Sequence, residues 1–204
     1  MLAIIVISPW IYRGYRIYDR FIFISTTSSE HFWRGNNPVA SGGGLTKNNK
    51  PILEAAGIDF KEKIISLNEI DRRNFFMKEA ISFIKSSPFD FIKLTTKKFI
   101  CFWSFSPQIG IIYPKSWSAI YKILFIIIAF FFLSGMFFVF KNKSMVNLPA
   151  IGFLLSFFAM ISLAQSFYYV DMRHRITIEP LLMIFSAYGM ESIFSNLAKK
   201  KDVV

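Results

Sequence analysis

The sequence has very few residues that could form disulfides or bind a metal. Cys101 is the only cysteine among 204 residues, so no disulfide can form within the chain. His31 and His174 are the only histidines, and no His-Glu-x-x-His spacing occurs, so nothing favours a zinc site. We therefore expect no metal site and no cofactor.

Acidic residues are also scarce. The chain has 13 aspartates and glutamates against 24 lysines and arginines, which gives a formal net charge of +11. A basic excess can indicate nucleic-acid binding. Here, however, most lysines and arginines are interleaved with acids rather than gathered in a stripe with stacking aromatic residues. The pattern therefore argues against a nucleic-acid partner.

Apolar residues are abundant, and they are gathered in runs. They make up 53% of the chain, with 25 phenylalanines, and the longest runs occupy residues 123–140, 148–164 and 176–194. A helix needs roughly 20 predominantly apolar residues to cross the hydrocarbon core of a bilayer. The sequence thus predicts a mainly α, polytopic membrane protein with about three transmembrane helices in residues 117–195.

The third of these runs is the least apolar. It contains Glu179 and Glu191, and a carboxylate inside lipid is costly. Glu179 lies within one helical turn of Arg175, so we expect it to lie near the membrane interface.

Positive charges predict the orientation of the chain. Lys141 and Lys143 lie in a short link, residues 196–204 form a basic tail, and short cytoplasmic segments are rich in lysine and arginine. Both are expected in the cytoplasm, which leaves residues 10–116 as an extracytoplasmic loop region of mixed, largely helical structure. Residues 1–9 are apolar but too short to span a bilayer, and are expected to be the remnant of a membrane helix that ends at Pro9.

Two helices are predicted in the loop region. The first follows "SLNE", Ser66 to Glu69, which has the spacing of a capping box. Its apolar face is predicted to contain Met77, Ala80, Ile81 and Ile84.

The second predicted helix covers residues 88–103. Ser87 suits the N-cap, Pro88 the first helical position and Asp90 the positive end of the helix dipole. One side is predicted to contain Ile92, Thr95, Phe99, Phe102 and Trp103, with Lys93 and Lys97 on another. This division suits a helix in the headgroup plane of a membrane, or a loop helix packed on its neighbours.

The stretch "HFWRGNNPVASGGG", residues 31–44, is rich in glycine and asparagine and is predicted to be a loop. It either closes turns or lines a ligand site. Glu30 and His31 are adjacent and could be considered as a catalytic acid–base pair. They are poorly placed to act together if they lie in a strand, because neighbouring strand residues point to opposite faces.

Three segments resemble a known family in their order along the chain. They are "PWIYRGYRIYDRFIFISTTSSEHFWRGNNPVASGG", "NEIDRRNFFMKEAISFIKSSPFDFIKLTTKKFICFWS" and "YYVDMRHRITIEPLLMIFSAYG". Together they resemble the bacterial glycosyltransferases of the C-type fold that use lipid-linked sugars, a group that includes the lipid A aminoarabinose transferase and relatives of protein O-mannosyltransferases. The matching positions of the first segment are Pro9, Trp10, Arg13, Trp33, Gly35, Asn36, Asn37 and Pro38, while Gly14 stands where asparagine is usual.

The resemblance implies a multi-pass enzyme of the bacterial cytoplasmic membrane that transfers a sugar from a polyprenyl-phosphate donor to a lipid, glycan or protein. In the family, the catalytic acid lies in an earlier outer loop, to which none of the three segments corresponds. We therefore expect this chain to be a C-terminal part with no catalytic residue of its own, either a gene fragment or one half of a split enzyme whose N-terminal half is a separate chain. A non-catalytic membrane subunit that binds lipid-linked sugar is the alternative, and a small transporter has little support.

The candidate binding residues fall into two sets. The substrate-binding set is Arg13, Trp33, Asn36, Asn37, Arg173 and Arg175, and the set for a lipid phosphate or headgroup is Lys97 and Lys98. The two late arginines could bind a lipid phosphate, or could anchor the interface with Asp171. The asparagine amides could bond sugar hydroxyls or close a turn, and Arg13 could simply extend its charge to the interface.

Overall fold

The computed structural model describes residues 2–22, 25–42, 45–46, 48, 50–104, 114–142, 147–170 and 172–201. These residues are mainly helical, and within them the only bridge between extended segments joins Leu45 and Pro51. They form two compact units, which are described separately. Unit 1 comprises Met1–Lys98 and Ser166–Val170, and unit 2 comprises Phe99–Gln165 and Asp171–Val204.

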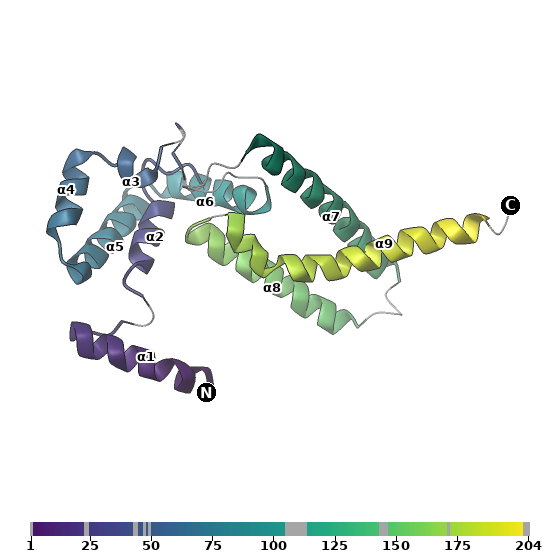
Figure 1. The fold of residues 1–204 in the computed structure, drawn as a ribbon, viewed down its shortest axis with the longest axis horizontal. Helices are drawn as coiled ribbons and strands as arrows, with labels where there is room; N and C mark the ends of the chain where they lie inside the picture. The colour runs from purple at the N-terminus through teal and green to yellow at the C-terminus, as the bar shows by residue number, and fades with distance from the viewer. Residues whose placement is uncertain are drawn as a thin grey trace. The chain divides into compact units, whose positions relative to one another are not determined.

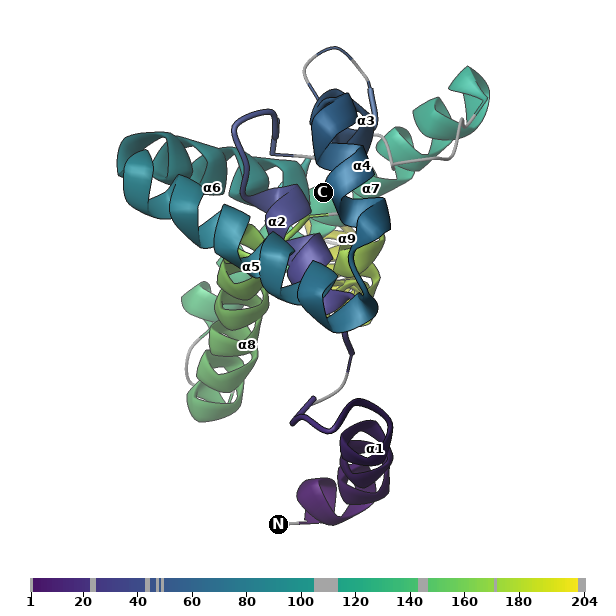
Figure 2. The ribbon, with the colours of Figure 1, turned by 90° about the vertical axis from the view of Figure 1, so that its left-hand side faces the viewer.

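Unit 1 is built from short helices (Figures 1 and 2). They are α1 (Leu2–Tyr18), α2 (Ser28–Gly35), α3 (Ile52–Ala55), α4 (Ile58–Ser66), α5 (Glu69–Ser86) and the first part of α6 (Pro88–Trp103). α2 packs along α5, and Trp33 of α2 stacks on Phe60 of α4 with ring centroids 4.7 Å apart. Phe76 and Ala80 of α5 complete this buried cluster with Ile52 and Ile64.

Helix α1 continues through Pro9 rather than ending there. A proline inside a helix has no N–H for the carbonyl four residues earlier, here that of Ile5. The Ser8 hydroxyl donates to this Ile5 carbonyl oxygen at 2.8 Å, so the acceptor that Pro9 leaves without a backbone donor has another partner. Pro9 therefore lies inside α1, which ends at Tyr18.

The capping box predicted at Ser66 is wrong. Ser66 is the last residue of α4, and its hydroxyl donates to the Lys63 carbonyl at 2.8 Å. Asn68 is the N-cap of α5 instead, and its side-chain oxygen accepts from the Asp71 backbone N–H at 2.9 Å. Asparagine at this position gives the same type of cap two residues later.

Residues 28–35 are helical, so the prediction that the loop begins at His31 and the assumption of a strand at Glu30 and His31 are both wrong. On α2, Glu30 instead forms an ion pair with Arg34 one turn later, with an N–O distance of 2.6 Å. The His31 ring lies 5.6 Å from that of Tyr169.

Unit 2 contains the long apolar helices α7 (Lys115–Lys141), α8 (Leu148–Phe167, ending in unit 1) and α9 (Glu179–Lys201), with the 3-10 helix η2 (Met172–Thr177) before α9. α7 and α9 cross in close contact (Figure 1). Phe132 of α7, Phe158 of α8 and Phe185 of α9 meet in an aromatic cluster with centroid distances of 5.7–6.1 Å. Phe158 therefore joins α8 to the pair formed by α7 and α9.

Two described helices are long and apolar enough to cross a membrane. They cover Ala119–Lys141, with a mean hydropathy of 2.9, and Leu148–Phe167, with a mean hydropathy of 1.8. Only 11% of each segment is buried within the protein, so most of its apolar surface faces outward. This supports membrane association. The third predicted span is also a helix, α9, but among the described helices only the first two have the length and hydropathy of a span.

Candidate functional site

The polar stretch that follows α2 is held by backbone contacts. Gly35, at the end of α2, lies directly against the Tyr168 carbonyl, where a Cβ atom would overlap the oxygen. Asn36 is fully buried, and its amide donates to the carbonyls of Phe32, Phe167 and Tyr168 at 2.9–3.1 Å. This amide therefore joins α2 to the 166–170 segment of unit 1.

Lys98 of α6 completes this cluster. Its ammonium donates to the Asn36 side-chain oxygen at 2.8 Å and to the Phe167 carbonyl at 3.2 Å, and the side chain has no solvent exposure. Within the described part of the chain, no carboxylate forms an ion pair with Lys98, although the Phe91 ring lies 5.8 Å from its nitrogen. Burial lowers the pKa of Lys98 from 10.5 to about 7, because desolvation penalises the charged form.

Asn37 is also buried and turns the chain. Its amide donates to the Trp33 carbonyl at 2.8 Å, and its oxygen accepts from the Val39 N–H at 2.9 Å. Of the two roles considered for the asparagine pair, these contacts are the ones that close a turn. Sugar binding by either amide stays a prediction.

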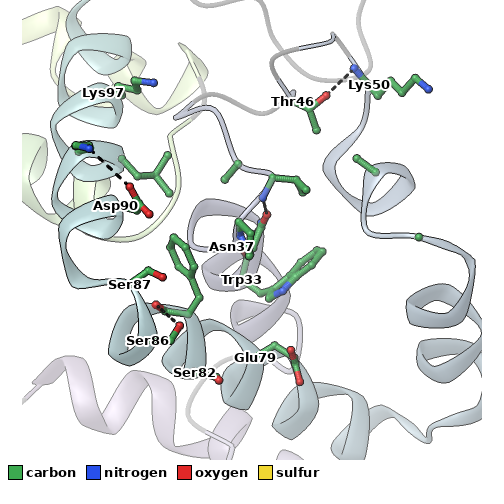
Figure 3. A pocket seen from close by; sticks show the side chains of 18 of the residues that line it. Trp33, Asn37, Thr46, Lys50, Glu79, Ser82, Ser86, Ser87, Asp90 and Lys97 are labelled. Atoms are coloured by element: carbon green, nitrogen blue, oxygen red, sulfur yellow. Dashed lines mark hydrogen bonds and ion pairs between the residues drawn. The ribbon is translucent and has the colours of Figure 1, made fainter.

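A cavity of about 1110 Å³ lies beside this stretch in unit 1 (Figure 3). Residues 37–40 form part of its wall, α5 and α6 form two further sides, and the chain around Thr46 and Lys50 forms another. The cavity is large for a small-molecule site, since such sites typically measure about 300–1,000 Å³. Trp33 is among the lining residues, although most of its side chain is buried against Phe60 and Phe76.

The lining of the cavity combines apolar residues with polar residues of both charges. Its cations are Lys50, Lys93 and Lys97, its anions are Glu54, Glu79 and Asp90, and its hydroxyl and amide side chains are Asn37, Thr46, Asn48, Ser82, Ser86 and Ser87. Hydroxyls, amides and equal numbers of cations and anions suit an uncharged or zwitterionic ligand with several hydroxyl groups. Among the described residues, no group of three or more His, Cys, Asp or Glu side chains could hold a metal ion.

Arg175 forms a separate polar cluster inside unit 2. It has no solvent exposure, and its guanidinium donates to Glu179 at 3.2 Å, to the Tyr121 hydroxyl at 2.8 Å and to the carbonyls of Phe102 and Ser104. The guanidinium carbon also lies 3.8 Å from the centroid of the Phe125 ring. All three of its nitrogens therefore have partners within the unit.

The remaining predicted residues are scattered. Trp33 is a core residue that also reaches the cavity, and Lys97 lies on the cavity wall. Arg13 is on α1, with its guanidinium carbon 5.2 Å from the Trp10 ring. The side chain of Arg173, together with Asp171, lies outside the described residues. The predicted set is thus not one site.

Sequence reasoning missed most of the cavity lining. Ser82 and Ser86 occupy the polar side of a predicted amphipathic helix, where solvent contact is the ordinary interpretation, and Thr46 and Lys50 lie in a glycine- and asparagine-rich segment. No local pattern distinguishes such residues from other surface positions. Only the approach of α5, α6 and the 46–50 segment brings them together.

Lys98 predicts a measurable pH dependence. Above pH 7 the folded protein holds a neutral amine, while an unfolded lysine stays protonated up to about pH 10.5. The unfolded state then binds more protons, so the free energy of unfolding rises with pH across this window, by on the order of 5 kcal/mol in total. The melting temperature of the wild type minus that of Lys98→Met, measured in detergent, is expected to increase from pH 7 to pH 9.5. The variant lacks the titrating amine, so only the wild type gains this stability.

The neighbouring exposed lysine provides the control. Lys97→Met should give a curve parallel to that of the wild type, because Lys97 is exposed to solvent. If Lys98→Met also runs parallel to the wild type, Lys98 does not titrate in this range in the folded protein.

Comparison of the chain with protein-family models, with curated proteins and with solved structures found no match. The resemblance to the lipid-linked-sugar transferases therefore rests on the quoted segments alone, and it stays a prediction.

Proposed function

We propose that this chain is part of a membrane glycosyltransferase that uses a polyprenyl-phosphate-linked sugar. The observation that carries the proposal is the cavity of about 1110 Å³, whose lining has hydroxyl and amide side chains and three residues of each charge. The same chain has two helices long and apolar enough to cross a bilayer. A ligand with several hydroxyl groups and an apolar carrier matches that combination. The catalytic acid is proposed to come from outside the three segments that resemble the family.

The proposal includes three spans, α7, α8 and α9, in the bacterial cytoplasmic membrane. Unit 1 would then lie outside and the basic tail in the cytoplasm, as the positive charges predict. The pairing of Glu179 with Arg175 and Tyr121 supports α9 as a span, because a bonded carboxylate near the interface costs less than an isolated one.

A photoreactive polyprenyl phosphate carrying a hexose, a pentose or no sugar tests the proposal. We expect the full protein in lipid nanodiscs to capture the sugar-bearing probe in preference to the bare one. Ser82→Trp puts a large side chain into the cavity and should abolish this preference. Ser66→Trp is the matched control, because Ser66 is exposed at the end of α4 and does not line the cavity.

Equal capture of bare and sugar-bearing probes by the wild type would overturn the proposal. Sugar-dependent capture, without transfer of labelled sugar in native membranes, would instead favour the alternative of a non-catalytic subunit. Asn36→Ala and Asn37→Ala are poor tests, because both side chains hold buried backbone and their loss would disturb the fold.

A further inference from the structure

Helix α6 has a buried face and, on the opposite side, an exposed apolar face. One contains Leu94, Lys98 and Phe102, four residues apart and buried in the protein. The opposite face contains Phe89, Ile92, Thr96, Phe99 and Ile100, which the helical repeat of 3.6 residues brings to one side. The second face is fully formed as an apolar surface and turns away from the first.

This second face is exposed. The exposed fractions are 79% for Phe89, 59% for Ile92, 42% for Phe99 and 57% for Ile100. A few isolated apolar residues on a surface are ordinary, but a continuous apolar stripe along a helix indicates an interaction surface. Phe99 is the most covered of the four side chains, and the other three are more than half exposed.

The charges beside the stripe indicate what covers it. Lys93 and Lys97 are exposed along one edge, one and two turns after Asp90, and the Lys93 side chain is 77% exposed. The Asp90 Oδ1 atom lies 3.9 Å from the Lys93 Nζ atom at the start of the helix. No acidic residue follows Asp90 in α6. An apolar stripe bordered by lysines matches a layer that is apolar below and anionic at its surface.

The candidate spans add an independent reason. Ala119–Lys141 and Leu148–Phe167 are apolar enough to cross a bilayer, which supports membrane association of this chain. We propose that α6 lies on an anionic membrane surface, with Phe89, Ile92, Phe99 and Ile100 among the upper acyl chains and the two lysines at the lipid phosphates. Lys93 and Lys97 also line the cavity, but Phe89 and Ile92 do not, so labels at these two apolar positions test lipid contact separately from sugar binding.

Spin-label depth measurements on the full protein in nanodiscs test it. A label at Ile92→Cys in a Cys101→Ser background reports on the stripe, and Phe89→Cys gives a second position on the same face. Glu62→Cys on α4 is the control, because Glu62 is exposed and outside the stripe. Both stripe positions replace exposed side chains, so the fold should be retained, which circular dichroism checks.

In nanodiscs rich in phosphatidylglycerol, we expect oxygen to collide with the label at Ile92→Cys. We expect a water-soluble nickel complex to collide with this label several-fold less than with the control label. In pure phosphatidylcholine this shielding should weaken. Nickel access equal to that of the control would overturn the proposal. Shielding from both oxygen and nickel would overturn it as well, because it would mean that protein, and not lipid, covers the stripe.

Discussion

Arg175→Ala is expected to destabilise unit 2 by about 3 kcal/mol, the lower end of the cost of removing one partner of a buried ion pair, because Arg175 is buried but Glu179 is 23% exposed. The change removes one donor of Glu179, which keeps its bond from the Tyr121 hydroxyl, and the guanidinium donors to the Tyr121 hydroxyl and to the carbonyls of Phe102 and Ser104. It also removes the contact to the Phe125 ring. Buried acceptors that lose their donor keep the cost of desolvation without the bond. Thermal unfolding of the purified protein in detergent measures the loss.

Two further variants separate charge from geometry. Arg175→Lys keeps the positive charge but loses the planar fork that reaches several acceptors at once, so an intermediate loss is expected. Arg34→Ala is the matched control. The two pairs have the same spacing of four residues and glutamates of similar exposure, 25% for Glu30 and 23% for Glu179, but Arg34 is 28% exposed whereas Arg175 is buried. A partly exposed pair contributes about 0–1 kcal/mol. Equal small losses for Arg175→Ala and Arg34→Ala would show that the Arg175 cluster does not support the fold.

Gly135→Ala and Gly189→Ala are expected to separate α7 from α9. A Cβ atom on Gly135 would overlap the Phe185 carbonyl, and one on Gly189 would overlap the Phe131 carbonyl and approach the Gly135 nitrogen at 2.5 Å. The obstacles are backbone atoms that cannot rotate away, so the helices must move apart. Small residues at such crossings are typical of membrane helices that pack closely. We expect a loss of at least about 1–3 kcal/mol for either variant.

Gly152→Ala on α8 provides the control for this prediction. No atom lies within 4 Å of the position that its Cβ would occupy. Alanine there should be neutral, or should stabilise the helix by up to about 1 kcal/mol, because glycine is a weaker helix former. The melting temperatures of the three variants in detergent give the comparison. If Gly189→Ala and Gly152→Ala have the same melting temperature, the close crossing of α7 and α9 is not present in solution.

The start of a helix was predicted well where one residue, such as Pro88 in α6, marks it. Helix α6 begins at Pro88 as predicted, because proline favours the first turn of a helix, whereas Pro9 does not end α1 as predicted. Ser66 and Asn68 show the limit of this reasoning. Both are good caps two residues apart, and only the packing of α4 against its neighbours decides which of them starts α5.

Helix faces were predicted less well than helix ends. In α5 the buried pair is Phe76 and Ala80, while the predicted Ile81 is 40% exposed. In α6 the predicted apolar side is divided, since Phe102 is buried and Ile92 is exposed. A period of 3.6 residues shows that a helix has an apolar side, but a helix with apolar residues on two sides does not show which one meets the protein.

By itself the sequence determined the helical class, the two apolar helices long enough to cross a bilayer, and the positive charge of the segments around them, because each depends on residues adjacent in the chain. Only the tertiary structure decided the fate of Lys98 and Arg175. Both are charged residues that composition places at a surface, yet both are buried, because carbonyls and side chains from distant segments surround them. Such partners are separated by 50 or more residues in most of these contacts, and no local pattern specifies them.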